Sequence, residues 1–366
     1  MTAEGKTAGQ SLPISVRNVV KAYGPLRALD DMSIDVRAGE FMTLLGPSGS
    51  GKTTLLMALA GFVSPESGSI RFGGQEMVTV PPHKRGVGMV FQSYALFPFM
   101  SVEENVAYPL KIRRVSAADQ KARVEAALEL VQLGGYGGRR VHQLSGGQMQ
   151  RVALARAMVF EPRIILMDEP LSALDKKLRE QMQIELKALH RKLDATIVYV
   201  THDQREALTM SDRIAVINQG RIAQLDTPEA LYRRPKSLFV ADFIGESVVL
   251  PVVLHDGAAT LNGCKLKTTS SFGSAEGPYH LVIRPELLEL SPDSSDGLMN
   301  DLSGEVREVI YQGDSALVLV RVGVDQEISL RVPASRAGSA SIPDIAQRIS
   351  LGLHAEDTII VPETAL

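Results

Sequence analysis

Gly46-Pro47-Ser48-Gly49-Ser50-Gly51-Lys52-Thr53 is the stretch that decides the fold of this chain. It follows an apolar run, Phe41–Leu45, that predicts a buried strand, and it leads into a helical pattern over Thr54–Ala60. Its glycines let successive backbone N–H groups turn toward one point and surround an anion. The helix that follows directs the positive end of its dipole to the same place. The stretch therefore predicts a phosphate-binding loop between a strand and a helix.

The two residues that end this stretch suit the chemistry of a nucleotide. Lys52 is long and charged enough to reach the β- and γ-phosphates, and Thr53 offers a hydroxyl to Mg²⁺. A chance match to the pattern is the alternative, but it gives no reason for a strand before the loop and a helix after it. We therefore expect the phosphates of a nucleotide and Mg²⁺ as the ligands of this loop.

A second apolar run ends in a pair of carboxylates. Ile164–Met167 predicts a buried strand, and Asp168 and Glu169 follow it directly. Asp168 is then placed to hold Mg²⁺, and Glu169 lies beside the γ-phosphate, where it orients a water for in-line attack. The alternative is a strand that ends in a solvated acidic turn. The phosphate loop elsewhere in the chain favours the catalytic interpretation.

A third motif is the stretch Leu144-Ser145-Gly146-Gly147-Gln148, which leads into a helical pattern. A glycine-rich helix N-terminus is again a ready anion site. This one lacks a Lys-Thr pair of its own, so the chain has two phosphate-facing helix ends and one set of lysine and Mg²⁺ equipment. The simplest resolution is that a second copy of the chain completes the site. The alternative is an ordinary cap of a surface helix.

The first two-thirds of the chain alternate short apolar runs with helical patterns, which indicates a mainly parallel sheet covered by helices. Arg163–Met167 and Thr196–Val200 have the length and composition of buried strands, and Lys176–Leu193 between them predicts a long helix. Ala117–Leu133 and Gln148–Phe160 interrupt the strands. They predict a helical subdomain over about residues 93–160.

The pattern changes after Gly245, where long helical patterns give way to short β-prone runs. Gln312–Asp314 predicts a hairpin turn among them. We expect a flexible tail over residues 1–12, an α/β domain over 13–245 and a β-rich domain over 246–366. The β-prone runs are Val248–Leu254, His280–Ile283, Gly304–Tyr311, Ala316–Val322 and Ile328–Val332.

Composition excludes several classes of protein. The net charge of −3 argues against a chain built mainly to hold nucleic acid, and the single cysteine, Cys264, excludes an internal disulfide framework. No apolar run approaches the roughly 18 residues that a membrane-spanning helix needs. The charge is divided unevenly, with 8 basic and 16 acidic residues in Ser247–Leu366 and 31 basic and 26 acidic residues before it. We expect a soluble, cytosolic protein whose basic part holds the nucleotide.

Together these motifs, in this order and spacing, resemble the ATP-binding subunit of an ABC transporter over nearly the whole chain. The resemblance implies an α/β fold of the P-loop NTPase class, with a helical subdomain and a β-rich OB-like domain after it. Tyr23 matches the aromatic residue that stacks on adenine, Gln92 the glutamine that senses Mg²⁺ and the γ-phosphate, and His202 the switch histidine at the γ-phosphate. Ser172–Asp175 matches the loop that crosses to a partner subunit.

The resemblance thereby assigns roles residue by residue. Lys52, Glu169 and His202 are expected to act in catalysis, and Thr53, Gln92 and Asp168 to hold Mg²⁺. The residues expected to bind ATP are Tyr23, Gly46, Pro47, Ser48, Gly49, Ser50, Gly51, Lys52, Thr53, Thr54, Gln92, Ser145, Gly146, Gly147, Gln148 and Asp175.

Partners follow from the same resemblance. In the family, two subunits enclose two ATP molecules, which implies a homodimer. The aromatic-rich segment Gln92–Met100 matches the part that receives a short helix of a membrane subunit, although its apolar side chains also suit ordinary core. The resemblance implies two integral permease subunits, an indirect solute-binding protein, and a place on the cytoplasmic face of the inner membrane. No nucleic-acid partner is expected.

The transported solute is the least defined expectation. Val282–Glu286 and Tyr311–Ser315 resemble the small OB-like (TOBE) domain of ATPases that import polyamines, ferric iron, sugars and some oxyanions. The stretch from Pro82 to Pro98 is most similar to spermidine/putrescine importers. Ferric iron, sugar and phosphonate remain alternatives. A soluble ABC-type ATPase acting on nucleic acid or ribosomes is the alternative from another class, and the OB-like domain is open to binding a regulator or the solute.

Overall fold

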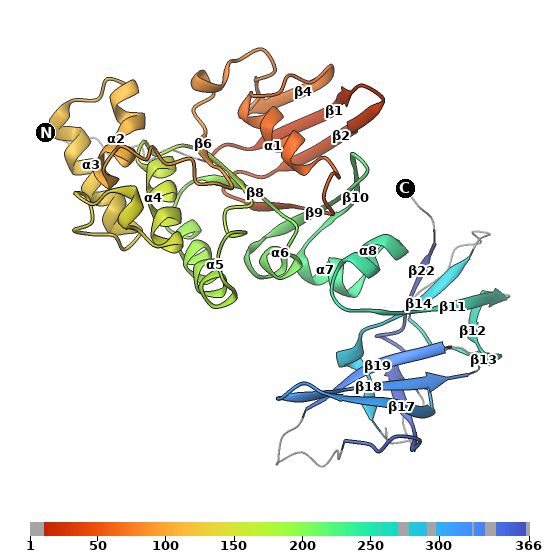
Figure 1. Cartoon of the computed structure of the whole chain (residues 1–366). Helices are drawn as coiled ribbons and strands as arrows, with labels where there is room; N and C mark the ends of the chain where they lie inside the picture. The colour runs from red at the N-terminus through yellow and green to blue at the C-terminus, as the bar shows by residue number, and fades with distance from the viewer. Residues whose placement is uncertain are drawn as a thin grey trace, which may run out of the picture. The chain divides into compact units, whose positions relative to one another are not determined.

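The computed structural model describes residues 11–255, 257–269, 278–290, 298–323, 326–333 and 342–363. It divides into two compact units, one up to Pro228 and one from Glu229 onward (Figure 1). This division falls earlier in the chain than the boundary expected near residue 245. Most of the expected tail, residues 1–10, lies outside the described residues.

A six-stranded sheet forms the centre of the first unit, in the order β10-β9-β3-β8-β7-β6. All neighbouring pairs are parallel except β9 and β10. The predicted mainly parallel sheet is confirmed, and the strands expected before the phosphate loop and before the acidic pair are both fully buried. The strands are β3 (Phe41–Leu45), β6 (Gly88–Val90), β7 (Ile164–Asp168), β8 (Thr196–Thr201), β9 (Arg213–Asn218) and β10 (Arg221–Asp226).

A second, antiparallel sheet packs with the first through helix α1 (Lys52–Ala60). Its strand order is β2-β1-β4-β5, with β1 (Ile14–Tyr23), β2 (Leu26–Val36), β4 (Ser67–Phe72) and β5 (Gln75–Glu76). Leu55, Leu56 and Leu59 of α1 share one apolar core with residues from both sheets. Burial on this scale stabilises by about 1.5–3 kcal/mol for each fully buried Leu. The phosphate loop is thus carried at the start of a helix that both sheets hold in place.

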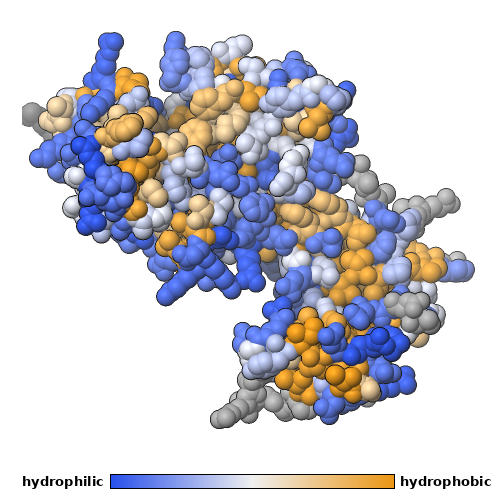
Figure 2. Space-filling view, viewed as in Figure 1, coloured by the Kyte–Doolittle hydropathy of each residue, from blue (hydrophilic) through white to orange (hydrophobic). Residues whose placement is uncertain are grey.

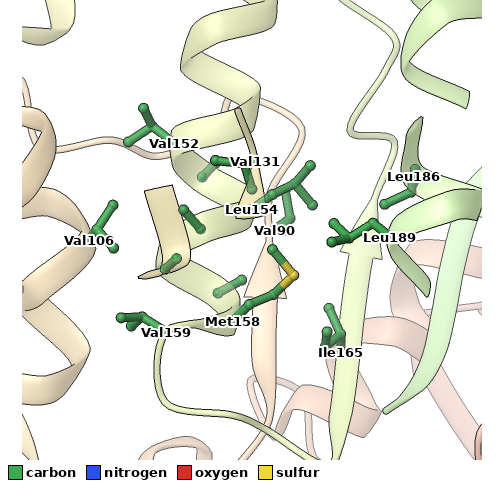
Figure 3. Packing of buried hydrophobic residues seen from close by; sticks show 14 of the residues in the cluster. Val90, Val106, Val131, Val152, Leu154, Met158, Val159, Ile165, Leu186 and Leu189 are labelled. Atoms are coloured by element: carbon green, nitrogen blue, oxygen red, sulfur yellow. The ribbon is translucent and has the colours of Figure 1, made fainter. Parts of the chain in front are cut away.

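Four helices form the other core of the unit: α2 (Val102–Ile112), α3 (Ala117–Leu130), α4 (Gly146–Met158) and α5 (Lys176–His190). Figure 3 shows Val152, Leu154 and Met158 of α4 among apolar side chains from α2, β6, β7 and α5. Ser101 begins α2 with a reciprocal cap, since its hydroxyl accepts from the Glu104 amide and the Glu104 carboxylate accepts from the Ser101 amide. Of the four helices, α2, α3 and α4 lie within residues 93–160, where the sequence predicted a helical subdomain. Helix α6 (Gln204–Met210) follows β8.

The second unit is rich in β-strands, and all five predicted runs form strands. They correspond to β11 (Val248–His255), β14 (Tyr279–Ile283), β17 (Gly304–Tyr311), β18 (Ser315–Val322) and β19 (Gln326–Pro333). β17 and β18 pair antiparallel across the predicted hairpin turn. The remaining strands are β12 (Ala258–Leu261), β13 (Cys264–Lys265), β15 (Glu289–Leu290), β16 (Met299–Asp301), β20 (Arg348–Ile349), β21 (Leu351–His354) and β22 (Ile359–Pro362).

A buried arginine explains why α8 (Leu238–Phe243) belongs with these strands. Arg284, at the end of β14, is 0% exposed and its guanidinium donates to the carbonyl oxygens of Ala241, Ile244 and Tyr232. Its guanidinium also lies 4.3 Å above the ring of Tyr232, in α7 (Pro228–Arg233). Burial lowers the pKa of Arg284 to about 10. A buried cation needs these acceptors, so the two helices stay attached to the β-rich part.

The surface of the chain is mixed in polarity. Figure 2 shows hydrophilic residues over much of the visible face, with hydrophobic residues gathered in smaller patches. None of the described helices has the length and apolarity needed to cross a membrane. Phe99 is the most exposed of the large apolar residues described, at 91%. It lies in the aromatic-rich segment singled out from the sequence.

Candidate functional site

The loop between β3 and α1 has the shape that its glycines allow. A Cβ added at Gly46 would lie 2.2 Å from the carbonyl oxygen of Ile217, and one at Gly51 would lie 2.2 Å from that of Ala28. Gly51 also has a φ of 106°, which a residue with a side chain adopts only at a cost. At Gly49, with φ 78°, nothing lies within 4 Å of the added carbon. The loop is closely packed at both ends and open near its middle.

Lys52 lies inside this loop. Its Nζ donates to the carbonyl oxygens of Gly46 and Pro47, each at 2.8 Å, and the residue is 5% exposed. Burial lowers the pKa of the Lys52 ammonium, and the carboxylates of Glu169 and Asp168 oppose that shift. The Ser50 hydroxyl beside it is buried and has no protein partner. Together they form a cationic, donor-rich pocket wall that fits a phosphate group.

Thr53 and Asp168 meet where the loop faces the end of β7. The Thr53 hydroxyl donates to Oδ1 of Asp168 at 3.2 Å. Burial raises the pKa of Asp168, and the Thr53 hydrogen bond lowers it. A hydroxyl and a carboxylate side by side are the oxygen donors that Mg²⁺ prefers. The donor set therefore fits the expected ion.

Glu169 follows β7 directly and contacts residues that follow β6 and β8. Its carboxylate lies 3.1 Å from Nδ1 of His202 and accepts from Nε2 of Gln92 at 3.3 Å. Its φ is 43°, a left-handed conformation that is strained for a residue with a side chain. The Glu169 amide donates to the carbonyl of Val200 at 3.0 Å, which holds the strained turn to β8. Residues predicted from distant parts of the sequence thus share one carboxylate.

Ser172 completes this cluster. Its hydroxyl donates to the Glu169 carbonyl at 2.9 Å and lies 3.5 Å from Nε2 of Gln92. A shallow, open pocket of about 500 Å³ lies beside these groups, lined by Phe91, Gln92, Ser93, Asp168, Ser172 and Ala173. The Gln92, Glu169 and His202 side chains and the Thr53–Asp168 pair therefore meet at the carboxyl ends of β6, β7 and β8. Ligands bind at this edge of open α/β sheets.

The residues predicted at the start of α4 form a separate cluster. The Ser145 hydroxyl accepts from the Gln148 amide and the Gln148 side chain accepts from the Ser145 amide, so the two residues cap the helix reciprocally. Gly147 lies against Leu178, and Asp175 caps α5 by accepting from the Leu178 amide. No hydrogen bond or ion pair within the described ranges joins these residues to the phosphate loop.

Tyr23 also lies apart from the catalytic groups. It ends β1, is 51% exposed, and has the Lys21 ammonium 5.3 Å from its ring centre. An exposed ring at a strand end is free to accept a flat base, but nothing in the described part of the chain joins it to the loop by a hydrogen bond. The expected stacking role stays a prediction.

Two side chains that support the Gln92 segment had no distinguishing sequence signal. Arg156 of α4 donates to the carbonyls of Tyr94 and Ala95, each at 2.7 Å, and both of these residues have positive φ. Asn105 of α2 accepts from the Phe97 amide at 2.8 Å and donates to the Phe97 carbonyl. An arginine and an asparagine in helices resemble any polar helical residue, so only the folded loop reveals their role.

Comparisons with known proteins agree with this geometry. An ABC transporter family model matches residues 29–172, and a TOBE domain model matches residues 281–361. A spermidine/putrescine import ATP-binding protein (PotA 2) of Pseudomonas aeruginosa is 47% identical over 344 residues, 92% of this chain and 95% of that protein. The spermidine/putrescine import ATP-binding protein PotA of Chromobacterium violaceum is 48% identical over 341 residues, which cover 90% of this chain and 94% of that protein.

A solved structure gives the same fold for the first unit. It is a dimeric ATP-binding cassette in a post-hydrolysis state bound to ADP and Pi, 32% identical to this chain, with a TM-score of 0.54. The match covers 59% of this chain and 98% of the cassette. With the phosphate loop, the acidic strand end and the TOBE match, these similarities lead to one conclusion: the chain belongs to the family of ABC transporter ATP-binding proteins.

Proposed function

We propose that this chain is the ATP-hydrolysing subunit that energises import of polyamines such as spermidine and putrescine through an ABC transporter. The polyamine assignment is supported by relatives with 47–48% identity across at least 90% of the chain. The ATPase assignment is supported by one observation above others: the Glu169 carboxylate within hydrogen-bonding distance of both His202 and Gln92. Ferric iron, sugars and phosphonates are the alternative solutes, and the transport experiment below compares them with polyamines.

In this proposal the loop binds the phosphates of ATP and the strand ends carry out hydrolysis. Lys52 and the backbone amides of the loop bind the β- and γ-phosphates, and Tyr23 stacks on the adenine. Thr53, Gln92 and Asp168 would hold Mg²⁺, which would neutralise charge on the phosphates. Glu169 orients the attacking water and accepts a proton from it. His202 holds the Glu169 carboxylate in place and donates a hydrogen bond toward the γ-phosphate.

The second phosphate-facing helix, α4, acts across a dimer. Ser145, Gly146, Gly147 and Gln148 of one copy contact the γ-phosphate held by the other, with Asp175 at the same interface. Bound ATP then stabilises only the closed dimer, and hydrolysis removes the γ-phosphate that connects the two copies. The dimeric cassette of similar fold supports this arrangement.

The membrane partners are two permease subunits that dock on the segment Gln92–Met100. Phe99 is 91% exposed there, on a loop whose backbone Arg156 and Asn105 hold in place. An exposed aromatic on an ordered loop is typical of a partner contact. Through these subunits the chain lies on the cytoplasmic face of the inner membrane and serves a solute-binding protein indirectly, while the TOBE domain acts in regulation.

The variant Glu169→Gln tests the catalytic part. The amide keeps the size of the side chain and loses the proton acceptor, so we expect turnover to fall about 100-fold or more while ATP binding is retained. ATP hydrolysis and ATP binding by the purified full chain measure the two effects, and a closed dimer should accumulate. Full turnover in this variant would remove Glu169 from its proposed role.

Transport by the complex with its permease subunits tests the solute. Vesicles containing the complete importer, supplied with ATP, should take up labelled spermidine or putrescine and leave ferric ion, a sugar and a phosphonate outside. Uptake of another member of the panel instead would replace the polyamine. An ATPase that is stimulated by DNA or ribosomes, and that does not co-purify with permeases, would favour the soluble class of ABC ATPase.

A further inference from the structure

Two loops flank Glu169, and one arginine contacts both. The first loop, Ser172–Asp175, follows Glu169, and the second contains His202. Arg179 of α5 donates through one terminal nitrogen to the Leu174 carbonyl at 3.0 Å, and through the other to Oδ2 of Asp203 at 3.3 Å. Its side chain is 30% exposed. The planar fork of the guanidinium is suited to holding two acceptors at a fixed separation.

The side of this contact that holds His202 is a connected network. Asp203 follows His202 directly, its amide donates to the Thr201 hydroxyl at 3.0 Å, and its carboxylate caps α6 by accepting from the Arg205 and Glu206 amides. Glu206 is 2% exposed and accepts from the Tyr199 and Thr201 hydroxyls at 2.7 and 2.8 Å. The residues on both sides of His202 are therefore fixed by side-chain hydrogen bonds.

The Arg179 Nε adds a second connection to that network. It lies 3.9 Å from Oε1 of the buried Glu206. On the opposite side, the loop that Arg179 holds by the Leu174 carbonyl begins at Ser172, whose hydroxyl donates to the Glu169 carbonyl. Arg179 thus connects both neighbours of the Glu169–His202 pair, and among the described residues it makes no hydrogen bond or ion pair to either member of the pair.

We propose that Arg179 is a positioning residue for hydrolysis, which fixes His202 against Glu169 by holding their two loops together. This proposal rests on the proposed function, because it needs Glu169 and His202 to act on ATP. The Ser172–Asp175 loop is the proposed dimer contact. Through Arg179, a shift of this loop on dimer closure therefore also changes the position of His202. Groups that act on a reacting centre lose roughly 100-fold for a misplacement of about 1 Å.

The test is steady-state ATP hydrolysis and ATP binding by the full chain carrying Arg179→Met. We expect kcat to fall roughly 10- to 100-fold while KM and the affinity for ATP stay within about threefold, because no contact to the nucleotide is lost. Arg179→Lys keeps the charge but not the fork, so its kcat should lie between those of Arg179→Met and wild type. If Arg179→Met does not fold, Arg179→Lys carries the test.

Arg213→Met is the matched control. Arg213 also joins a backbone carbonyl, that of Asp35, to a buried carboxylate, that of Glu40, each at 3.3 Å, and it lies outside the proposed site. Its kcat should stay near that of wild type. An equal loss of kcat in Arg213→Met and Arg179→Met would show a general effect of losing a partly buried arginine and would overturn the proposal.

Single-turnover hydrolysis in a Glu169→Gln background separates positioning from a structural role. If Arg179 acts through the Glu169–His202 pair, adding Arg179→Met to Glu169→Gln should lower the residual rate by less than about threefold. A full 10- to 100-fold further loss would overturn the proposal. A wild-type chain without ATPase activity would overturn the proposed function and this proposal with it, whereas an active wild type with unchanged kcat in Arg179→Met overturns this proposal alone.

Discussion

The N-termini of α1 and α4 are built in opposite ways. Helix α1 begins after Gly51, which has φ 106° and offers no side chain to its amides. Helix α4 begins after Ser145, which exchanges two hydrogen bonds with Gln148. The first four amides of any helix need a partner from outside its own ladder. At α4 part of that need is met within the chain, and at α1 no side chain meets it.

This difference suggests a division of labour between the two helices. The α1 terminus, with Lys52 beside it, is suited to bind phosphate without help from a second copy. The α4 terminus is partly satisfied by its Ser145–Gln148 cap, and it brings no cation of its own. Binding is therefore expected to depend on α1, and the later, dimer-dependent step on α4. Three substitutions test this comparison.

The largest effect is expected from Lys52→Ala at α1. A hydrogen bond to a charged group is worth about 1.5–3 kcal/mol, so the affinity for ATP should fall roughly 10- to 100-fold. Calorimetric titration of the purified chain with ATP measures it. Lys84→Ala removes an exposed lysine and serves as the control. Unchanged affinity in Lys52→Ala would mean that the α1 terminus does not dominate binding.

Gly51→Ala tests the backbone of the same loop. The new Cβ would collide with the Ala28 carbonyl at 2.2 Å, so the free energy of unfolding should fall by about 1–3 kcal/mol beyond the cost of the positive φ. Gly49→Ala is the matched control, because its φ is also positive and nothing lies within 4 Å of the added carbon. Denaturant unfolding compares the two. Equal losses would exclude the collision as the cause.

Ser145→Ala is expected to have the smallest effect, and at a different step. Loss of the cap costs about 1 kcal/mol of stability. Turnover should fall, while ATP binding by dilute chain should not, because in the proposed function α4 acts only in the dimer. Ser116→Ala removes the corresponding cap of α3, where Ser116 accepts from the Asp119 amide, and leaves the site alone. Equal turnover in the two variants would reduce Ser145 to a helix cap.

Local patterns predicted much of the fold. The strand predicted over Phe41–Leu45 has those same bounds, and the strand predicted over Gly304–Tyr311 likewise matches β17. Each strand could be predicted because its own residues form an apolar or alternating pattern. The antiparallel pair β1–β2 was not predicted, since its pattern is broken by register shifts such as those between Val16 and Lys21. A bulge alters the alternation on which the prediction depends.

The residues of the candidate site likewise differ in whether a local sequence pattern could predict them. Lys52, Thr53, Asp168 and Glu169 were visible in short motifs, and resemblance supplied Gln92 and His202. The supports were not visible: Arg156 and Arg179 bind backbone carbonyls that are far away in sequence or exposed only by an irregular turn. A carbonyl acceptor has no residue identity, so no sequence pattern marks its donor.

The clamp of Arg156 and Asn105 on the aromatic-rich loop has an entropic consequence. Fixing one residue's backbone costs roughly 1–2 kcal/mol. Because the carbonyls of Tyr94, Ala95 and Phe97 are already held by side chains of α2 and α4, a partner that meets Phe99 does not have to order the loop. A small contact there can therefore contribute more of its interaction energy to binding, because less of it is spent on ordering the loop.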